Sequence, residues 1–257
     1  MFVTYSLSGN VATIVLNRPD KFNSFNREMA LLFQEHLKSA QSDDRVRAIL
    51  ITGEGKAFCA GQDLSEAIDE SGPGIQKIVA EHYNPIILLL RTIEKPIVCA
   101  VNGVAAGAGA NIAFACDITF AAQSASFIQA FSKIGLVPDS GGTFTLPRLI
   151  GLQRASALMM LGEKVSAEQA AQMGMIYKVV ADDELITLAL QTASTLAALP
   201  TKGLGLTKRL LNQSANNNLE EQLHQEQIEQ AEAGRSHDYK EGVNAFLEKR
   251  KPNFIGK

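Results

Sequence analysis

The chain has 257 residues, of which 46% are hydrophobic and 20% are charged. These proportions are ordinary for a globular enzyme, and the length allows one large domain or two small ones without disulfide bonds. The formal net charge of -3, from 24 basic and 27 acidic residues, argues against a surface that binds nucleic acid. The three cysteines are an odd number, which argues against a disulfide framework and favours a reducing, cytoplasmic location.

No membrane contact is expected. The start of the chain, Met1–Tyr5, has no basic segment followed by an apolar one, so we expect no signal peptide. The uncharged stretch 96–116 is long enough to cross a bilayer. It contains Asn102, Asn111 and three glycines, however, which favour a buried strand, a tight turn and a helix of small residues.

The first half of the chain alternates short β-branched runs with helical apolar spacing. The predicted elements, in chain order, are strands at 11–16, 47–52, 96–101 and 117–121, with helices at 26–40 and 108–115. Such alternation is typical of α/β proteins, so we expect a largely parallel core sheet. The segment 65–76 is rich in Ser, Gly, Pro and acidic residues and is predicted to be a mobile loop, and whether it closes over a ligand stays open.

After about residue 151, only the stretch 174–180 has a residue pattern that predicts a β-strand. The predicted helices of this part are 152–161, 166–173, 183–198, 203–217, 219–234 and 238–250. We therefore expect an α/β core over residues 1–195 and a helical C-terminal region over 196–257 that serves assembly and completes part of the ligand site.

The string Asp139-Ser140-Gly141-Gly142 matches the residues around the nucleophile of trypsin-like proteases. That architecture is a pair of antiparallel barrels, which a chain so rich in helices does not form. None of the four histidines, His36, His82, His224 and His237, stands where a triad base would be expected. The string is therefore interpreted as a turn or as a lone carboxylate placed as a base.

Two stretches could present bare backbone N–H groups to a ligand. The glycine-rich segment 103–109 follows a strand and opens a helix, but Ile112 stands where a dinucleotide fingerprint has its third glycine. Glycines let the backbone approach a ligand, and free N–H groups at a helix start favour an oxyanion. Close helix packing by small residues is the alternative interpretation.

The second stretch, 56–64, has an Ala-Gly pair after a turn. Its Cys59 has no His or Arg beside it in sequence, so we expect a buried thiol rather than a nucleophile. No metal-binding spacing of His or Cys occurs in the chain, so no metal site is expected.

Several motifs together carry a resemblance that covers essentially the whole chain. They are LNRPDKFNSFN (16–26), KAFCAGQDL (56–64), KPIVCAVNGVAAGAGANIAFACDI (95–118), GLVPDSGGT (135–143) and EGVNAFLEKRKPNF (241–254). By these motifs the chain resembles the enoyl-CoA hydratase/isomerase family, the crotonase superfamily. The resemblance implies a spiral of β-β-α units with a helical C-terminal region, assembled as a homotrimer or homohexamer.

The resemblance also implies the chemistry of an acyl-CoA thioester that reacts through an enolate. It assigns the oxyanion hole to the backbone N–H groups of Gln62 and Ala108, and it implies no cofactor, since coenzyme A is part of the substrate. The implied CoA-binding residues are Lys21, Phe22, Ala60, Asp63, Leu64, Phe246 and Lys249. The last two are expected to reach a neighbouring subunit.

The family's hydratases use two glutamates, and the matching positions here are Asn111 and Phe131, which we expect to line the substrate pocket. Neither side chain exchanges a proton, so water addition is disfavoured. Asp139 stands where the family keeps the functional aspartate of certain isomerases and dehalogenases. We expect Leu136, Val137 and Pro138 to desolvate this carboxylate in part, which would raise its pKa and suit it to shuttling a proton.

Within the superfamily the chain is most similar to isomerases of phenylacetate catabolism, on motifs at 83–85, 102–110, 130–133, 138–143 and 166–170. This similarity implies conversion of ring 1,2-epoxyphenylacetyl-CoA to oxepin-CoA, together with 3-enoyl to 2-enoyl-CoA isomerisation. The alternatives are a general 3-enoyl-CoA to 2-enoyl-CoA isomerase or other enoyl-CoA hydratase-family member of fatty-acid oxidation, a dehalogenase that uses Asp139 as nucleophile, and a catalytically idle subunit that binds acyl-CoA.

Overall fold

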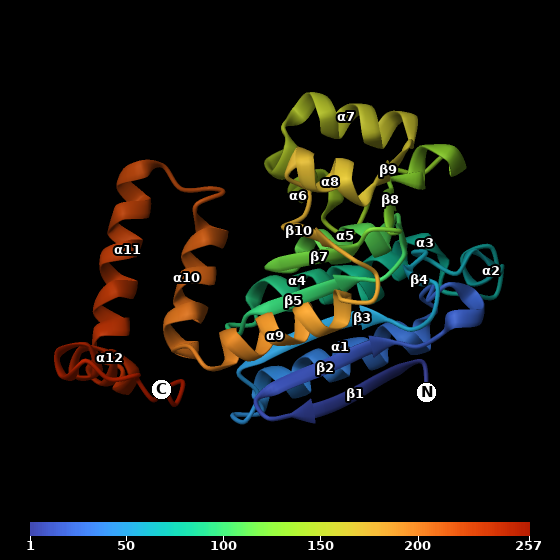
Figure 1. Cartoon of the computed structure of the whole chain (residues 1–257). Coiled ribbons are helices and arrows are strands. Elements are labelled where there is room, and N and C mark those ends of the chain that lie inside the picture. The colour runs from blue at the N-terminus through green and yellow to red at the C-terminus, as the bar shows by residue number, and fades with distance from the viewer.

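A six-stranded sheet forms the centre of the computed structural model, which describes residues 1–257 (Figure 1). In spatial order its strands are β1 (Val3–Ser8), β2 (Val11–Leu16), β3 (Ala48–Gly53), β5 (Ile97–Val101), β7 (Ile118–Ala122) and β10 (Lys178–Val180). All neighbouring strands are parallel except β1, which pairs antiparallel with β2. Every residue of β3 and β5 is buried, as expected for parallel strands covered on both faces. The predicted parallel core sheet is confirmed.

A second, smaller sheet contains β4 (Ala57–Cys59), β6 (Val104–Ala106), β8 (Ser126–Ile128) and β9 (Lys164–Ser166). The chain passes from β3 to β4, from β5 to β6 and from β7 to β8, so successive strands alternate between the two sheets. Helical segments follow each of these pairs. This is the expected spiral of β-β-α units. The four strands of the second sheet were not predicted from the sequence. Each has three residues, which is too few to show the alternation of apolar and polar side chains that indicates a strand.

Amphipathic helices cover the large sheet. Asn26 caps α1 (Arg27–Ser42) by accepting a hydrogen bond from Met29 N–H, and Met29, Phe33 and Leu37 form its buried stripe. α1 contacts β1 and β2, whereas α9 (Leu185–Ala197) contacts β2, β3, β5 and β7. The other helices of the body are η1 (Pro19–Lys21), α2 (Leu64–Ala67), α3 (Gly74–Lys77), η2 (Ile78–Tyr83), α4 (Asn84–Thr92), α5 (Ala108–Ala115), η3 (Ala130–Ile134), α6 (Gly142–Ile150), α7 (Leu152–Leu161) and α8 (Ala167–Met173).

The segment 65–76 was predicted to be a loop, but its two ends lie in the short helices α2 and α3. Asp63 caps α2 by accepting a hydrogen bond from Ser65 N–H, a local contact that a pattern of loop-forming residues does not reveal. None of the helices combines the length and the hydrophobicity that a membrane-spanning segment requires. The uncharged stretch 96–116 instead forms β5, β6 and α5.

The C-terminal region consists of α10 (Thr201–Gln213), α11 (Leu219–Gly234) and α12 (His237–Glu248), which stand to one side of the body in Figure 1. These helices were predicted, with ends that differ by a few residues. Lys208 of α10 forms an ion pair of 2.8 Å with Asp117, which precedes β7, and so ties the region to the body. The domain boundary after residue 195 stays a prediction; α9 ends two residues later, at Ala197.

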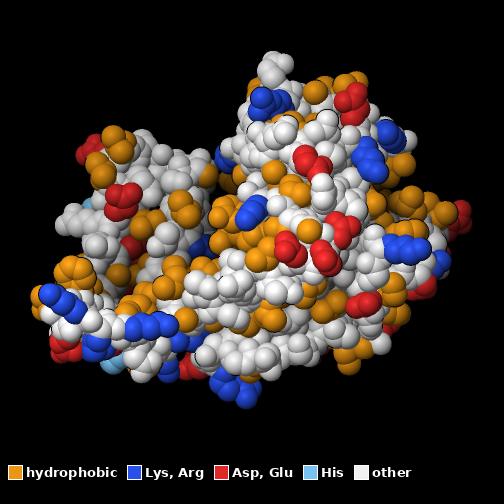
Figure 2. Space-filling view, viewed as in Figure 1, with side chains coloured by type: hydrophobic (Ala, Val, Ile, Leu, Met, Phe, Trp, Pro, Cys, Tyr) orange, Lys and Arg blue, Asp and Glu red, His pale blue; other side chains and the backbone are white.

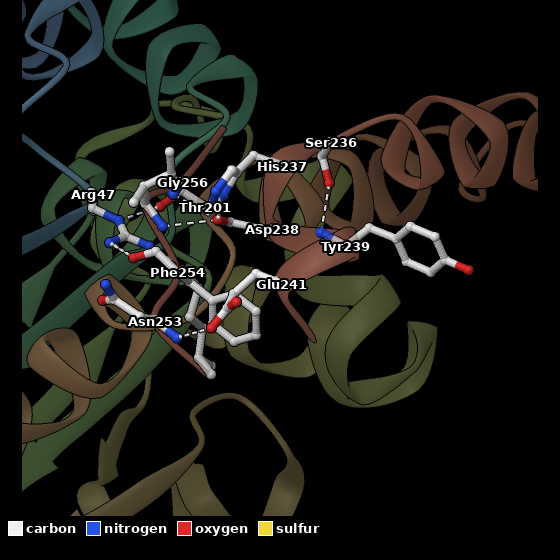
Figure 3. Close-up of polar contacts among 12 residues, drawn as sticks. Arg47, Thr201, Ser236, His237, Asp238, Tyr239, Glu241, Asn253, Phe254 and Gly256 are labelled. Atoms are coloured by element: carbon white, nitrogen blue, oxygen red, sulfur yellow. Dashed lines mark hydrogen bonds and ion pairs between the residues drawn. The ribbon is translucent and has the colours of Figure 1, made fainter. Parts of the chain in front are cut away.

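The last residues of the chain fasten α12 to the body (Figure 3). The buried Asp238 carboxylate accepts hydrogen bonds from Ile255 N–H at 2.8 Å and Gly256 N–H at 2.7 Å. Arg47, which precedes β3, donates to the carbonyl oxygen of Phe254 at 2.8 Å and to Thr201 Oγ1 at 2.9 Å. The position of α12 therefore depends on the C-terminal residues, which contact both Asp238 of α12 and Arg47 of the body.

Gly109→Ala should destabilise the protein by about 1–3 kcal/mol, because the added methyl group overpacks the junction of α5 and β4. A Cβ atom there would collide with the Cys59 carbonyl oxygen and lie 2.7 Å from the Cys59 Cβ atom. Gly203→Ala is the control: in α10 the added Cβ would meet only Pro200, at 3.9 Å. Urea unfolding should show a loss for the first variant and none for the second, whereas equal stability of both would contradict this tight packing.

Candidate active site

An apolar pocket lies where α2, η2, η3 and the start of α5 meet. Its empty volume is about 820 Å³, including space open to solvent, and 12 of its 17 lining residues are hydrophobic. The side chains of Ile75, Ile78, Val79, Phe131 and Ile134 contribute to this lining. A concave apolar surface with few polar groups is typical of a small-molecule site.

Two unpaired backbone N–H groups border the pocket, those of Gln62 and Ala108. Neither donates a hydrogen bond to another group of the protein. Gln62 follows β4 and Gly61, whose φ is +90°, and Ala108 is the first residue of α5 after Gly107, whose φ is +53°. A Cβ atom at Gly61 would lie 3.5 Å from Ala108 N, so the two segments approach closely. The arrangement has the donors that an oxyanion requires.

The carboxyl group of Asp139 lies in the same pocket. Burial raises its pKa from the ordinary value, and a hydrogen bond from Ser140 Oγ to Asp139 Oδ1, 2.8 Å long, acts in the opposite direction. Val137 was expected to shield the Asp139 carboxyl group from water, but its side chain is 79% exposed, so this prediction is wrong. The carboxyl group loses water because it lies in a pocket with a mainly hydrophobic lining.

The two positions that hold glutamate in hydratases have different surroundings. Phe131 is buried and lines the pocket, as expected. Asn111 does not line it: the amide is buried behind the turn that carries Asp139 and donates to the Asp139 carbonyl oxygen at 2.9 Å. Gln129 Nε2 in turn donates to Asn111 Oδ1 at 2.8 Å. Asn111 thus supports the turn rather than facing the pocket.

Most of the residues assigned to coenzyme A lie at the pocket or beside it. Ala60 and Leu64 line the pocket, and Ala60 N–H donates to the Phe22 carbonyl oxygen at 2.9 Å. The Phe22 ring is exposed, as is Lys21 before it. The Asp63 carboxylate pairs with Arg18 at 3.0 Å besides capping α2, so its interactions are with the protein.

Phe246 and Lys249 do not reach this pocket within one chain. They lie on and just after α12, at the opposite end of the molecule from α2 and α3 (Figure 1). Phe246 is 82% exposed. Figure 2 shows hydrophobic side chains on the surface of this C-terminal region, which includes the exposed Leu219 and Leu247. A role for these two residues in binding coenzyme A therefore requires a second subunit.

Sequence reasoning did not assign Tyr83 to the site. The Tyr83 hydroxyl donates to Gln62 Oε1 at 2.9 Å, while Gln62 Nε2 donates to Glu66 Oε2 at 2.9 Å. Burial raises the pKa of Tyr83 well above its usual range, so the phenol stays neutral. Tyr83 ends the π-helix η2, and such helices are frequent at functional sites but have no simple sequence pattern.

Comparisons with known proteins agree with this geometry. Residues 6–257 match the family model described as enoyl-CoA hydratase/isomerase. The chain is 50% identical to 1,2-epoxyphenylacetyl-CoA isomerase of Escherichia coli K12, an alignment that covers 100% of this chain and 99% of the relative. It is 42% identical to a Rhodobacter capsulatus protein named "Probable enoyl-CoA hydratase", with 99% and 98% covered.

A solved structure of enoyl-CoA hydratase from Bacillus anthracis superposes with a TM-score of 0.93 at 30% identity, and 100% of each chain is covered. The fold, the full-length family match and the relatives agree. The chain belongs to the enoyl-CoA hydratase/isomerase family, within the crotonase superfamily of enzymes.

Proposed function

We propose that the protein is an acyl-CoA isomerase that converts ring 1,2-epoxyphenylacetyl-CoA to oxepin-CoA and also moves double bonds between the 3- and 2-enoyl positions. The proposal rests on the half-buried carboxyl group of Asp139, which lies in an apolar pocket that two unpaired N–H groups border. The choice of the aromatic substrate is supported by the Escherichia coli relative, which is named as an isomerase of 1,2-epoxyphenylacetyl-CoA.

The thioester oxygen would accept hydrogen bonds from the N–H groups of Gln62 and Ala108, which stabilise the negative charge of the enolate. Removing one such donor from an enzyme typically costs about 3–4 kcal/mol of transition-state stabilisation. With a 3-enoyl substrate, the Asp139 carboxylate takes a proton from C2 and the resulting carboxylic acid returns one to C4. The carboxylate is regenerated, and no water is consumed. With the epoxide, Asp139 would take the α-proton to give the enolate, the bond between the two epoxide carbons would break as the oxepin ring forms, and the resulting carboxylic acid would return the proton to a ring carbon.

Hydration has less support from this site. Asn111 and Phe131 carry no exchangeable proton suited to activating water, and Phe131 places an aromatic ring in the pocket. A general 3-enoyl-CoA to 2-enoyl-CoA isomerase of fatty-acid oxidation is the second candidate, because the same carboxyl group performs that reaction. Relative kcat/KM for 3-hexenoyl-CoA and for enzymatically generated epoxyphenylacetyl-CoA separates the two, since only the aromatic isomerase prefers the epoxide.

We further propose a homotrimer or homohexamer in which α12 of a neighbouring subunit brings Phe246 and Lys249 to the coenzyme A site. This assembly is supported by the exposed apolar side chains on the C-terminal helices and by the distant position of α12 within the chain (Figure 1). The cytoplasmic location and the lack of an added cofactor remain predictions.

Asp139→Asn should lower kcat for 3-hexenoyl-CoA isomerisation by about 10²–10⁴-fold, since a positioned general base contributes that factor. Binding of the CoA ester, measured by calorimetry, should persist because the amide keeps the shape of the carboxyl group. Asp183→Asn, at an exposed position outside the pocket, is the matched control and should retain the parent rate. Full turnover by Asp139→Asn would remove Asp139 from the role of base.

The rate should also depend on pH in a defined direction. Burial raises the pKa of Asp139 above the ordinary 3.8, and only the ionised form takes a proton, so kcat/KM should rise with pH through a midpoint above 3.8. The other titratable side chains of the lining are Tyr83 on η2, which stays neutral, and Lys133 on η3. A rate that falls as pH rises through this range, with the fold intact by circular dichroism, would contradict an ionised aspartate as the base.

A further inference from the structure

The turn that carries the carboxyl group has an unusual residue at its centre. Gly142 N–H donates to the Asp139 carbonyl oxygen at 2.9 Å, which closes a turn over residues 139–142. Both central residues have positive φ, 51° at Ser140 and 69° at Gly141. Turns of this kind favour glycine, asparagine and aspartate, because other side chains are strained in the left-handed region. Glycine at position 140 would therefore relieve strain that serine retains.

Compared with glycine, serine at position 140 provides a hydroxyl group. Ser140 is 2% exposed, and its Oγ atom lies 2.8 Å from Asp139 Oδ1, its one hydrogen-bond partner in the protein. Because a carboxylate is only an acceptor, the hydroxyl donates when Asp139 is ionised. A strained residue that contacts a functional group is grounds for a functional hypothesis.

The backbone of the same turn is held from its other side. Asn111 Nδ2 donates to the Asp139 carbonyl oxygen at 2.9 Å, and Gln129 holds the Asn111 amide. A Cβ atom at Gly142 would collide with this amide, which shows how closely α5 and the turn pack. The backbone of Asp139 is therefore anchored by Asn111, and its carboxyl group has Ser140 as its one side-chain partner.

We propose that Ser140 is a positioning residue whose hydroxyl group holds Asp139 Oδ1, so that Oδ2 is the oxygen that exchanges the proton with the substrate. Oδ2 accepts no hydrogen bond from another residue, and Asp139 lines the pocket. This inference rests on the proposed role of Asp139 as the base. The sequence predicts only that Ser140 forms part of a turn, whereas this inference gives its hydroxyl group a role in orienting Asp139. The Asp-Ser pair then has a function that is unrelated to proteolysis.

The hydroxyl also affects the protonation of the base. Burial raises the pKa of Asp139, and the hydrogen bond from Ser140 lowers it by a smaller amount because it stabilises the ionised carboxylate. Removal of the hydroxyl group should therefore raise the pKa of Asp139. The groups around the carboxyl group are Tyr83 from η2, Lys133 from η3 and the neutral Asn111 from α5, and none of them is changed by a substitution at 140.

Ser140→Ala and Ser140→Gly form a matched pair for the test, because both remove the hydroxyl and only glycine relieves the positive φ. We expect kcat for 3-hexenoyl-CoA to fall about tenfold in both, as for the loss of a hydrogen bond to a charged group. The acid limb of kcat should move to higher pH in both, with little change in KM. The melting temperature of Ser140→Gly should equal or exceed that of the parent protein.

Parent kcat and an unshifted acid limb in Ser140→Gly would overturn the proposal and leave Ser140 as a turn residue. The same measurements on Asp139→Asn distinguish this failure from failure of the proposed function. If Asp139→Asn is inactive while Ser140→Gly behaves as the parent, only the positioning role is wrong. If Asp139→Asn is fully active, the role of the base fails and the role of Ser140 fails with it.

Discussion

The close approach of α5 to the end of β4 is the constraint on which the site depends. It is possible only because glycine stands at 61, 107 and 109, where positive φ or the lack of room excludes a side chain. The approach places the unpaired N–H groups of Gln62 and Ala108 at one pocket. Main-chain donors that are rigidly held in this way need little reorganisation when charge develops on a bound oxygen.

The same helix also positions the carboxyl group. Ala108 begins α5, and Asn111, one turn further along, holds the backbone of Asp139. The Ala108 N–H group and the proposed base are therefore fixed relative to one another by a single helix, against which the Gln62 segment packs. Burial opposes ionisation of the Asp139 carboxyl group, whereas the hydrogen bond from Ser140 Oγ favours it. Double-bond isomerisation needs one group that both takes up and releases a proton, which is the role proposed for Asp139.

Much of the fold could be predicted from the sequence, because β3 and β5 are runs rich in β-branched residues and the apolar residues of α10 and α12 recur at helical spacing. The second sheet could not, since each of its strands has three residues and depends on pairing with distant segments.

The site, too, could be predicted only in part, because some of its contacts follow from local sequence and others from tertiary structure. The sequence motifs indicated the stretches 56–64 and 103–109, and the resemblance assigned the oxyanion hole to Gln62 and Ala108 and the functional carboxylate to Asp139. Asn111, however, was expected in the pocket and lies behind the turn, because the direction of its side chain follows from the packing of α5 on that turn. The contacts of Ser140 and Tyr83 depend on tertiary structure in the same way.

The proposed site isomerises a CoA thioester without using water. Mass spectrometry of the products formed from 3-hexenoyl-CoA in ¹⁸O-labelled water can show whether this is so. We expect a 2-enoyl product of unchanged mass with no label incorporated. A main product that carries an added, labelled water would show that the enzyme is a hydratase.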